Sequence, residues 1–217
     1  AEALEGLTSD EAMQSKYGVS GVAPLLFAVG DGNHSLATAK ACYEEQKAGK
    51  TPEEYLKLPA RYALVEVVNN HDDALQFEPI HRVVFDIDKD RFMEMFMAAY
   101  PNAYEGKGEG HVIELVWEGH DDFITVPDPK VQLAVGTLQA FIDAYLKEHE
   151  GEVDYIHGDD EVVELAQKEN AVGFLVPGME KHQLFRGVIS GGVLPRKTFS
   201  MGHAREKRYY MEGRRIK

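Results

Sequence analysis

The stretch from residue 24 to residue 40 constrains the fold most strongly. Residues 24–29 are apolar (Pro-Leu-Leu-Phe-Ala-Val), Gly30-Asp31-Gly32 follows, and a helical pattern begins at once. This order predicts a strand, a sharp turn and a helix. The first N–H groups of such a helix have no intrahelical partner and lie at the positive end of the helix dipole. We therefore expect that an anion, often a phosphate, can bind at this turn.

Polar residues gather at the same turn. Gly30 and Gly32 allow unusual backbone dihedrals and the close approach of a ligand. Four side chains there can bind a metal, move a proton or cap the helix: Asp31, Asn33, His34 and Ser35. A simpler interpretation stays open, because Asp-Gly is a common turn and Asn33 or Ser35 could serve only as an N-cap.

Composition limits the classes of function. The chain has 217 residues, is 44% hydrophobic and carries a formal net charge of −14. Such a charge argues against non-specific nucleic-acid binding and against an anionic membrane surface, so we expect neither nucleic acid nor a membrane as a partner. No apolar run reaches the roughly 18 residues that a membrane span needs. The single cysteine, Cys42, excludes an internal disulfide and favours the cytoplasm.

The charge is unevenly distributed, because the end of the chain is basic. This end suggests a local anion site or partners for internal salt bridges, with a solvated tail as the alternative. Its basic residues are Arg196, Lys197, Arg205, Lys207, Arg208, Arg214, Arg215 and Lys217. The other end has neither an initiator Met nor a signal-peptide pattern, and we expect the chain to be part of a longer protein.

The rest of the chain alternates between strand and helix patterns. Residues 61–68, 77–85, 153–157 and 171–177 predict strands, and residues 111–126 predict a hairpin. Helices are expected over residues 34–48, 88–100, 128–150 and 161–168, with a short one near 181–185. These patterns predict a single α+β domain over 1–217, with a mixed β-sheet and flanking helices.

His81 and Arg82 are neighbours in the middle of a predicted strand. Adjacent side chains of a strand point to opposite faces of the sheet. We therefore expect one of the two to face a pocket or a buried partner, and a satisfied structural pair is the alternative.

Several separated motifs resemble the bacterial family known as domain of unknown function 1015. They are Asp-Gly-x-His at Asp31–His34, Pro-Ile-His-Arg at Pro79–Arg82, Tyr-Ile-His-Gly at Tyr155–Gly158 and the segment Leu194–Gly202. Proteins of this family are longer at the N-terminus, so the resemblance implies that this chain is a C-terminal part.

The family turn, usually Asp-Gly-His-His-Arg-Tyr, is similar to the phosphate-binding motif of the ParB and sulfiredoxin superfamily. That superfamily includes nucleotide-dependent enzymes and a free-serine kinase, and the similarity implies a ParB/sulfiredoxin-like strand-turn-helix core. Asp31, Gly32 and His34 match the motif, whereas Asn33 stands where the family often has His. Ser35 replaces an arginine, which removes the fixed cation expected to hold a phosphate. Three bases are candidates to supply it: Arg82, Arg196 and Lys197.

Two functions follow as hypotheses. In the first, ATP or another nucleotide, or a phosphorylated small molecule, binds at Gly30–Leu36, and the protein is a phosphotransferase acting on a small-molecule substrate. Asp31 would hold Mg²⁺ or activate a hydroxyl, His34 would contact phosphate or move a proton, and Arg196 and Lys197 would neutralise charge.

In the second hypothesis the chain is a non-catalytic ligand-binding or scaffold domain that has lost nucleotide chemistry, which the Ser35 departure favours. A metal-dependent hydrolase using Asp31, His34 and another histidine has no ligand spacing to support it. DNA binding has no helix-turn-helix signal in its favour, and a homo-oligomer is left open.

Overall fold

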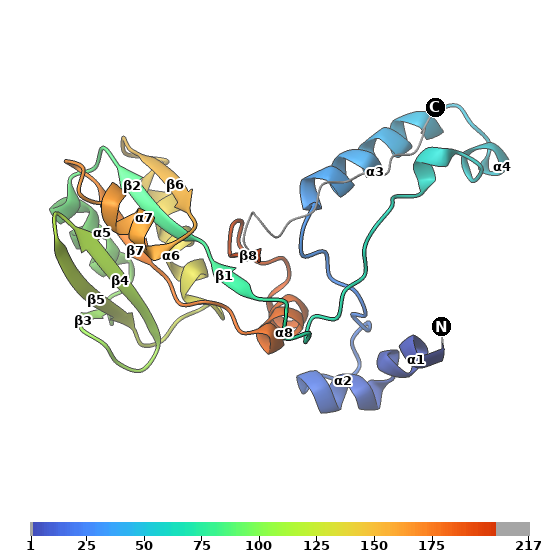
Figure 1. Cartoon of the computed structure of the whole chain (residues 1–217), viewed down its shortest axis with the longest axis horizontal. Coiled ribbons are helices and arrows are strands. Elements are labelled where there is room, and N and C mark those ends of the chain that lie inside the picture. The colour runs from blue at the N-terminus through green and yellow to red at the C-terminus, as the bar shows by residue number, and fades with distance from the viewer. Residues whose placement is uncertain (1, 203–217) are drawn as a thin grey trace. The chain divides into compact units, whose positions relative to one another are not determined.

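The computed structural model describes residues 2–202, and the chain divides into two compact units. The described residues of the first are 2–75, and those of the second are 76–202. Figure 1 labels the helices and strands of both units. The expectation of a single domain over 1–217 stays a prediction.

The described part of the first unit is helical. Its elements are α1 (Glu2–Glu5), α2 (Asp10–Tyr17), α3 (Asn33–Lys47) and α4 (Pro52–Tyr55), with 3₁₀ turns at Gly6–Thr8 and Pro59–Arg61. The predicted helix over 34–48 is confirmed as α3. Gly32 precedes it, and Gly49, with a φ of 74°, follows it.

Two predicted strands are absent from the described part of this unit. Residues 24–29 and 61–68 are assigned to no strand, although both are rich in β-forming side chains. Many of their apolar side chains are exposed, with Phe27 at 55%, Leu64 at 76% and Val67 at 68%. A strand needs a neighbour to pair its N–H and C=O groups. Since no described residue provides that neighbour, the composition alone does not produce a strand.

The second unit is an α+β structure around a six-stranded sheet with flanking helices, so this part of the predicted fold class is confirmed, whereas the ParB/sulfiredoxin-like core stays a prediction. The strand order is β3-β5-β4-β7-β2-β6, and each pair of neighbours is antiparallel. The bounds are β2 (His81–Phe85), β3 (Tyr104–Glu105), β4 (His111–Trp117), β5 (His120–Val126), β6 (Glu152–Ile156) and β7 (Val172–Leu175). A separate two-stranded ribbon pairs β1 (Phe77–Pro79) with β8 (Phe199–Met201).

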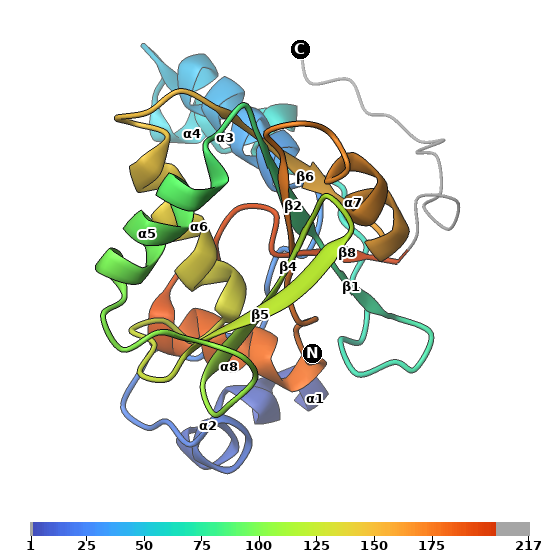
Figure 2. The same ribbon diagram turned by 90° about the vertical axis from the view of Figure 1, so that its left-hand side faces the viewer.

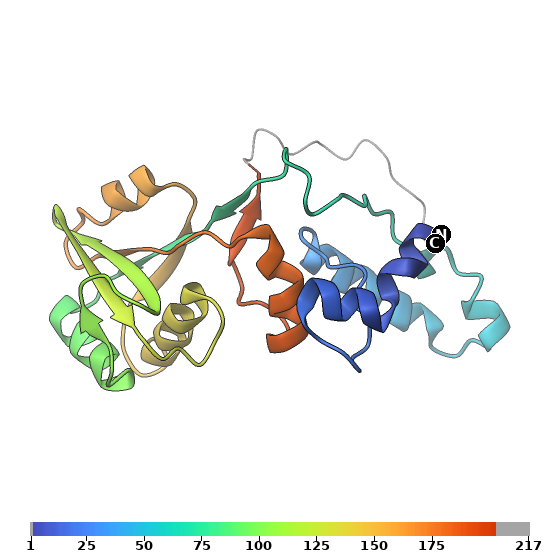
Figure 3. The ribbon, with the colours of Figure 1, turned by 90° about the horizontal axis from the view of Figure 1, so that it is seen from below.

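Helices cover both faces of this sheet, as Figures 2 and 3 show. On one face lie α5 (Lys89–Ala99) and α6 (Ala134–Tyr145), and on the other lies α7 (Asp159–Leu165). Neighbouring residues of β2 serve the two cores, because Val84 packs with the α5 and α6 side chains and Val83 packs with those of α7. This alternation is the strand periodicity of two.

Some predicted boundaries in this unit are wrong. The strand over 77–85 is divided into β1 and β2 at Ile80. The helix expected from Asp128 begins only at Ala134, and in the preceding segment the carbonyl of Gln132 accepts a hydrogen bond from Nε2 of His111 at 3.2 Å. The short helix near 181–185 extends as α8 (Lys181–Gly191). Among residues 2–202, no helix combines the length and the apolar character that crossing a membrane requires.

Candidate functional site

The Gly30–Leu36 turn has the geometry of an uncapped helix N-terminus. Gly32 is the N-cap of α3, with φ 75° and ψ 18° in the left-handed region. Its N–H donates to Oδ1 of Asp31 at 2.8 Å, and its carbonyl accepts from the N–H of Leu36 at 2.9 Å. No side chain caps the helix. The simpler interpretation of Asn33 or Ser35 as the N-cap is therefore wrong, since both lie inside the first turn.

The exposed backbone of this turn is suited to an anion. The N–H groups of Asn33, His34 and Ser35 have no acceptor among the described residues, as expected for a first helical turn. Their side chains are exposed, and an added Cβ at Gly32 would meet no atom within 4 Å. The α3 dipole favours negative charge at this end. No lysine or arginine lies within Gly30–Leu36.

The three candidate cations belong to the second unit. Arg82, on β2, is 0% exposed. Its Nε donates to Oε1 of Gln139 at 3.0 Å, one terminal nitrogen donates to the carbonyl of Ile80, and the other donates to the carbonyl of Arg196 at 3.1 Å. Burial lowers the pKa of Arg82 to about 10. These contacts make Arg82 a structural cation of the second unit.

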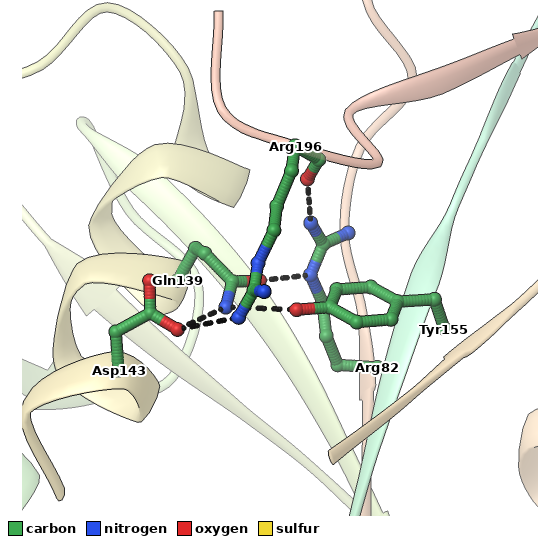
Figure 4. Close-up of polar contacts among 5 residues, drawn as sticks. All are labelled: Arg82, Gln139, Asp143, Tyr155 and Arg196. Carbon is green, nitrogen blue, oxygen red and sulfur yellow. Dashed lines mark hydrogen bonds and ion pairs between the residues drawn. The ribbon is translucent and has the colours of Figure 1, made fainter. Parts of the chain in front are cut away.

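A cluster of polar side chains surrounds Arg82, and Figure 4 shows it. The guanidinium groups of Arg82 and Arg196 lie 5.2 Å and 5.5 Å from the ring centroid of Tyr155. A terminal nitrogen of Arg196 lies 3.0 Å from Oδ1 of Asp143. Nε2 of Gln139 donates to the same oxygen at 2.9 Å and to the Tyr155 hydroxyl at 3.2 Å. We call these five residues the arginine cluster.

The turn from Pro195 to Thr198 presents the two remaining cations. The Thr198 hydroxyl donates to the carbonyl of Pro195 at 2.6 Å, and Thr198 is buried. Lys197 has a φ of 55°, which is unusual for a residue with a side chain, and it is exposed. The Arg196 side chain is 63% exposed. The expectation that these cations serve the Gly30–Leu36 turn stays a prediction, because the cations and the turn belong to different units.

His81 has two polar partners of its own. The N–H of Val176 donates to its Nδ1 at 3.1 Å, so Nε2 carries the proton and donates to Oδ1 of Asp159 at 2.8 Å. Burial lowers the pKa of His81, although Asp159 acts in the opposite direction. The expected buried partner is found at Arg82, which binds the buried Gln139 on α6, whereas His81 binds the N–H of Val176 and the exposed Asp159 at the start of α7.

Sequence reasoning missed two members of the arginine cluster, Gln139 and Asp143. They are four residues apart on α6, a mostly apolar helix, and this spacing places them on one helix face. A polar pair at this spacing in a mostly apolar helix is the sequence pattern that could have predicted a buried polar contact on α6. The other predicted basic residues lie outside the described residues: Arg205, Lys207, Arg208, Arg214, Arg215 and Lys217.

A metal centre gains no support within residues 2–202, where no group of three or more His, Cys, Asp or Glu residues is arranged to hold an ion. A search of curated proteins finds no match to the chain. A family model described as "Protein of unknown function (DUF1015)" matches residues 10–185. The chain therefore belongs to the DUF1015 family.

Proposed function

We propose that the chain binds a nucleotide or another phosphorylated small molecule at the Gly30–Leu36 turn. The observation that carries this proposal is the uncapped N-terminus of α3, a helix of 15 residues that begins at the left-handed Gly32. Unpaired N–H groups and a favourable dipole together form an anion site. The exposure of the turn gives a ligand access to them.

The side chains of the turn have distinct roles in this proposal. His34 donates a hydrogen bond to a phosphate oxygen, and the Ser35 hydroxyl can do the same. Asp31 fits as a ligand for Mg²⁺, since this ion is usually held by one or two carboxylates together with the phosphates of a substrate. Mg²⁺ would supply charge neutralisation there. A phosphotransferase is the enzyme class we propose, because positioning and electrostatics supply most of the catalysis of phosphoryl transfer.

A non-catalytic ligand-binding or scaffold domain is the second candidate. Two observations favour it. Ser35 leaves the turn without an arginine, and the complete burial of Arg82 commits that residue to its own unit. This candidate retains anion binding and lacks phosphoryl transfer, so an assay for phosphate release or transfer separates the two.

Substitutions at Ser35 provide the test. Ser35→Asp places a carboxylate in the first turn, which stabilises the helix by about 0.3–1 kcal/mol through the dipole and repels an anion. We expect this variant to melt higher than the wild type and to lose the stabilisation by ligand. Ser35→Asn is the neutral control, because asparagine is nearly equal in size to aspartate and has no charge. Ser35→Arg is expected to bind the anionic ligand more tightly than the wild type.

The ligands are ATP, CTP, GTP and pyrophosphate, each with and without Mg²⁺. A ligand at about 100 times its dissociation constant adds roughly 2.7 kcal/mol to the free energy of unfolding, which a melting curve resolves. If a folded wild-type protein gains nothing from any of them, or if Ser35→Asp and Ser35→Asn respond alike, the proposal fails.

Two glycines provide a matched control for backbone strain. Gly32 and Gly49 lie at the two ends of α3 with φ of 75° and 74°, and an added Cβ at either meets no atom within 4 Å. Gly32→Ala and Gly49→Ala should therefore each cost about 1–2 kcal/mol of stability. Only Gly32→Ala should also weaken ligand binding, because only Gly32 adjoins the proposed site.

A further inference from the structure

The starting observation is a buried cation without a carboxylate in contact. Arg82 is 0% exposed, and the acceptors of its hydrogen bonds among the described residues are neutral oxygens of Gln139, Ile80 and Arg196. A buried charge is costly unless an opposite charge compensates it. Asp143 makes no hydrogen bond to Arg82; it accepts from Gln139 and already pairs with Arg196. The arginine cluster therefore holds more positive than negative charge.

The adjoining turn increases this excess. With Lys197, the residue that follows Arg196 in the turn, the local count is three cations to one carboxylate, in a chain whose formal net charge is −14. No described residue pairs with the Lys197 ammonium. The turn is also held in place by two hydrogen bonds. Arg82 donates to the backbone carbonyl of Arg196, and the Thr198 hydroxyl donates to the carbonyl of Pro195. The left-handed φ of Lys197 is a strained conformation, of the kind that clusters at binding sites.

We propose that the second unit has an oxyanion site of its own at Arg196 and Lys197, and that the ligand is a dianionic phosphate group. The Arg196 fork donates two parallel hydrogen bonds to phosphate oxygens, and Lys197 acts as a point charge beside it. Arg82 does not touch the ligand, because it is buried. It supplies a fixed positive charge behind the turn and holds the backbone that carries Arg196.

Asp143 has a defined part in this site. It holds the guanidinium of Arg196 at 3.0 Å when no anion is present, and both side chains are partly exposed, at 44% and 63%. An arriving phosphate competes with this carboxylate for the same donors. Removing the negative charge at Asp143 should therefore strengthen phosphate binding.

Inorganic phosphate is the probe, titrated into the ¹⁵N-labelled full chain at constant ionic strength maintained with chloride. We expect saturable shifts of the Lys197 and Thr198 amide resonances. Arg196→Gln should weaken this binding about tenfold or more, since it removes a charge-assisted fork. It keeps the Arg196 carbonyl that Arg82 binds, so the turn is expected to stay in place.

Arg186→Gln is the matched control, because Arg186 is an exposed arginine on α8 of the same unit. It should leave phosphate binding unchanged, whereas Asp143→Asn, which keeps the Oδ1 acceptor, should tighten it several-fold. Equal losses in Arg186→Gln and Arg196→Gln would show only general charge attraction and overturn the proposal. So would shifts that do not saturate, or an Asp143→Asn variant that binds phosphate no better than the wild type.

The test also separates this site from the Gly30–Leu36 turn. Ser35→Asp should leave the phosphate-dependent shifts of Lys197 and Thr198 intact. If Ser35→Asp abolishes them while Arg196→Gln does not, phosphate binds at α3 and the second site is refuted.

Discussion

Replacing Arg82 by methionine should destabilise the second unit by about 1–3 kcal/mol. The substitution keeps an unbranched side chain of similar length and removes the guanidinium. It leaves three acceptors without their donor: Oε1 of Gln139 and the carbonyls of Ile80 and Arg196.

The three acceptors are not equivalent, and this difference sets the magnitude. Gln139 is buried, so its orphaned oxygen bears a desolvation cost of about 1–3 kcal/mol. Ile80 is half-buried and Arg196 is exposed, so water can replace their lost partner. Methionine also avoids the desolvation of a buried cation, which offsets part of the cost. Arg82→Ala adds a cavity and should be worse than Arg82→Met.

The assay is chemical denaturation of the full chain followed by tryptophan fluorescence. Trp117 is the only tryptophan of the chain and lies on β4, so its signal reports the second unit. Adding Gln139→Leu to Arg82→Met replaces both partners by apolar groups. The double variant should cost about 1–2 kcal/mol less than the sum of the single variants. Costs that add within about 0.5 kcal/mol would refute the inferred coupling.

Three further outcomes follow from the structure. Because burial lowers the folded pKa of both His81 and His111, the unfolded chain binds more protons below about pH 6.5, and denaturation of the second unit should become easier from that pH downward. Amides of residues 63–68 should exchange with solvent much faster than those of β2, since no described residue pairs with them; comparable protection in a hydrogen-exchange experiment would contradict this. Gly173→Ala should lower the free energy of unfolding by about 1–3 kcal/mol in the same fluorescence assay, because the added Cβ would lie 2.6 Å from a methyl of Val162. An unchanged free energy of unfolding would contradict this and show that the side chains around α7 repack to accept the methyl group.

Local pattern predicted much of the second unit. The alternating residues of β4 and β5, with Gly119 between them, predicted their hairpin, and the structure confirms it. In the first unit, by contrast, the β-rich residues 61–68 form no strand in the described structure. The difference is physical, since a hairpin carries its pairing partner within a few residues. An isolated β-rich segment depends on a partner that its own sequence does not specify.

The two candidate sites differ in the same respect, because one is made by residues close in sequence and the other by residues far apart. The Gly30–Leu36 turn is made by consecutive residues, and its main groups are backbone N–H donors, so the order of residue types was enough to find it. The arginine cluster is not local, because Arg82 and Arg196 are separated by 114 positions. Only the expectation of a buried partner at His81 or Arg82 could be drawn from strand periodicity.

The register of β2 links the two cores to the polar contacts of the second unit. His81 and Arg82 are adjacent, so the pleat sends one toward Asp159 at the start of α7 and the other toward Gln139 on α6. A shift of one residue would exchange the two faces, bringing a guanidinium to the α7 side and removing it from Tyr155. Val83 and Val84 would change cores at the same time. Apolar packing and polar contacts thus select the same register, which gives the Pro195–Thr198 turn a defined anchor in Arg82.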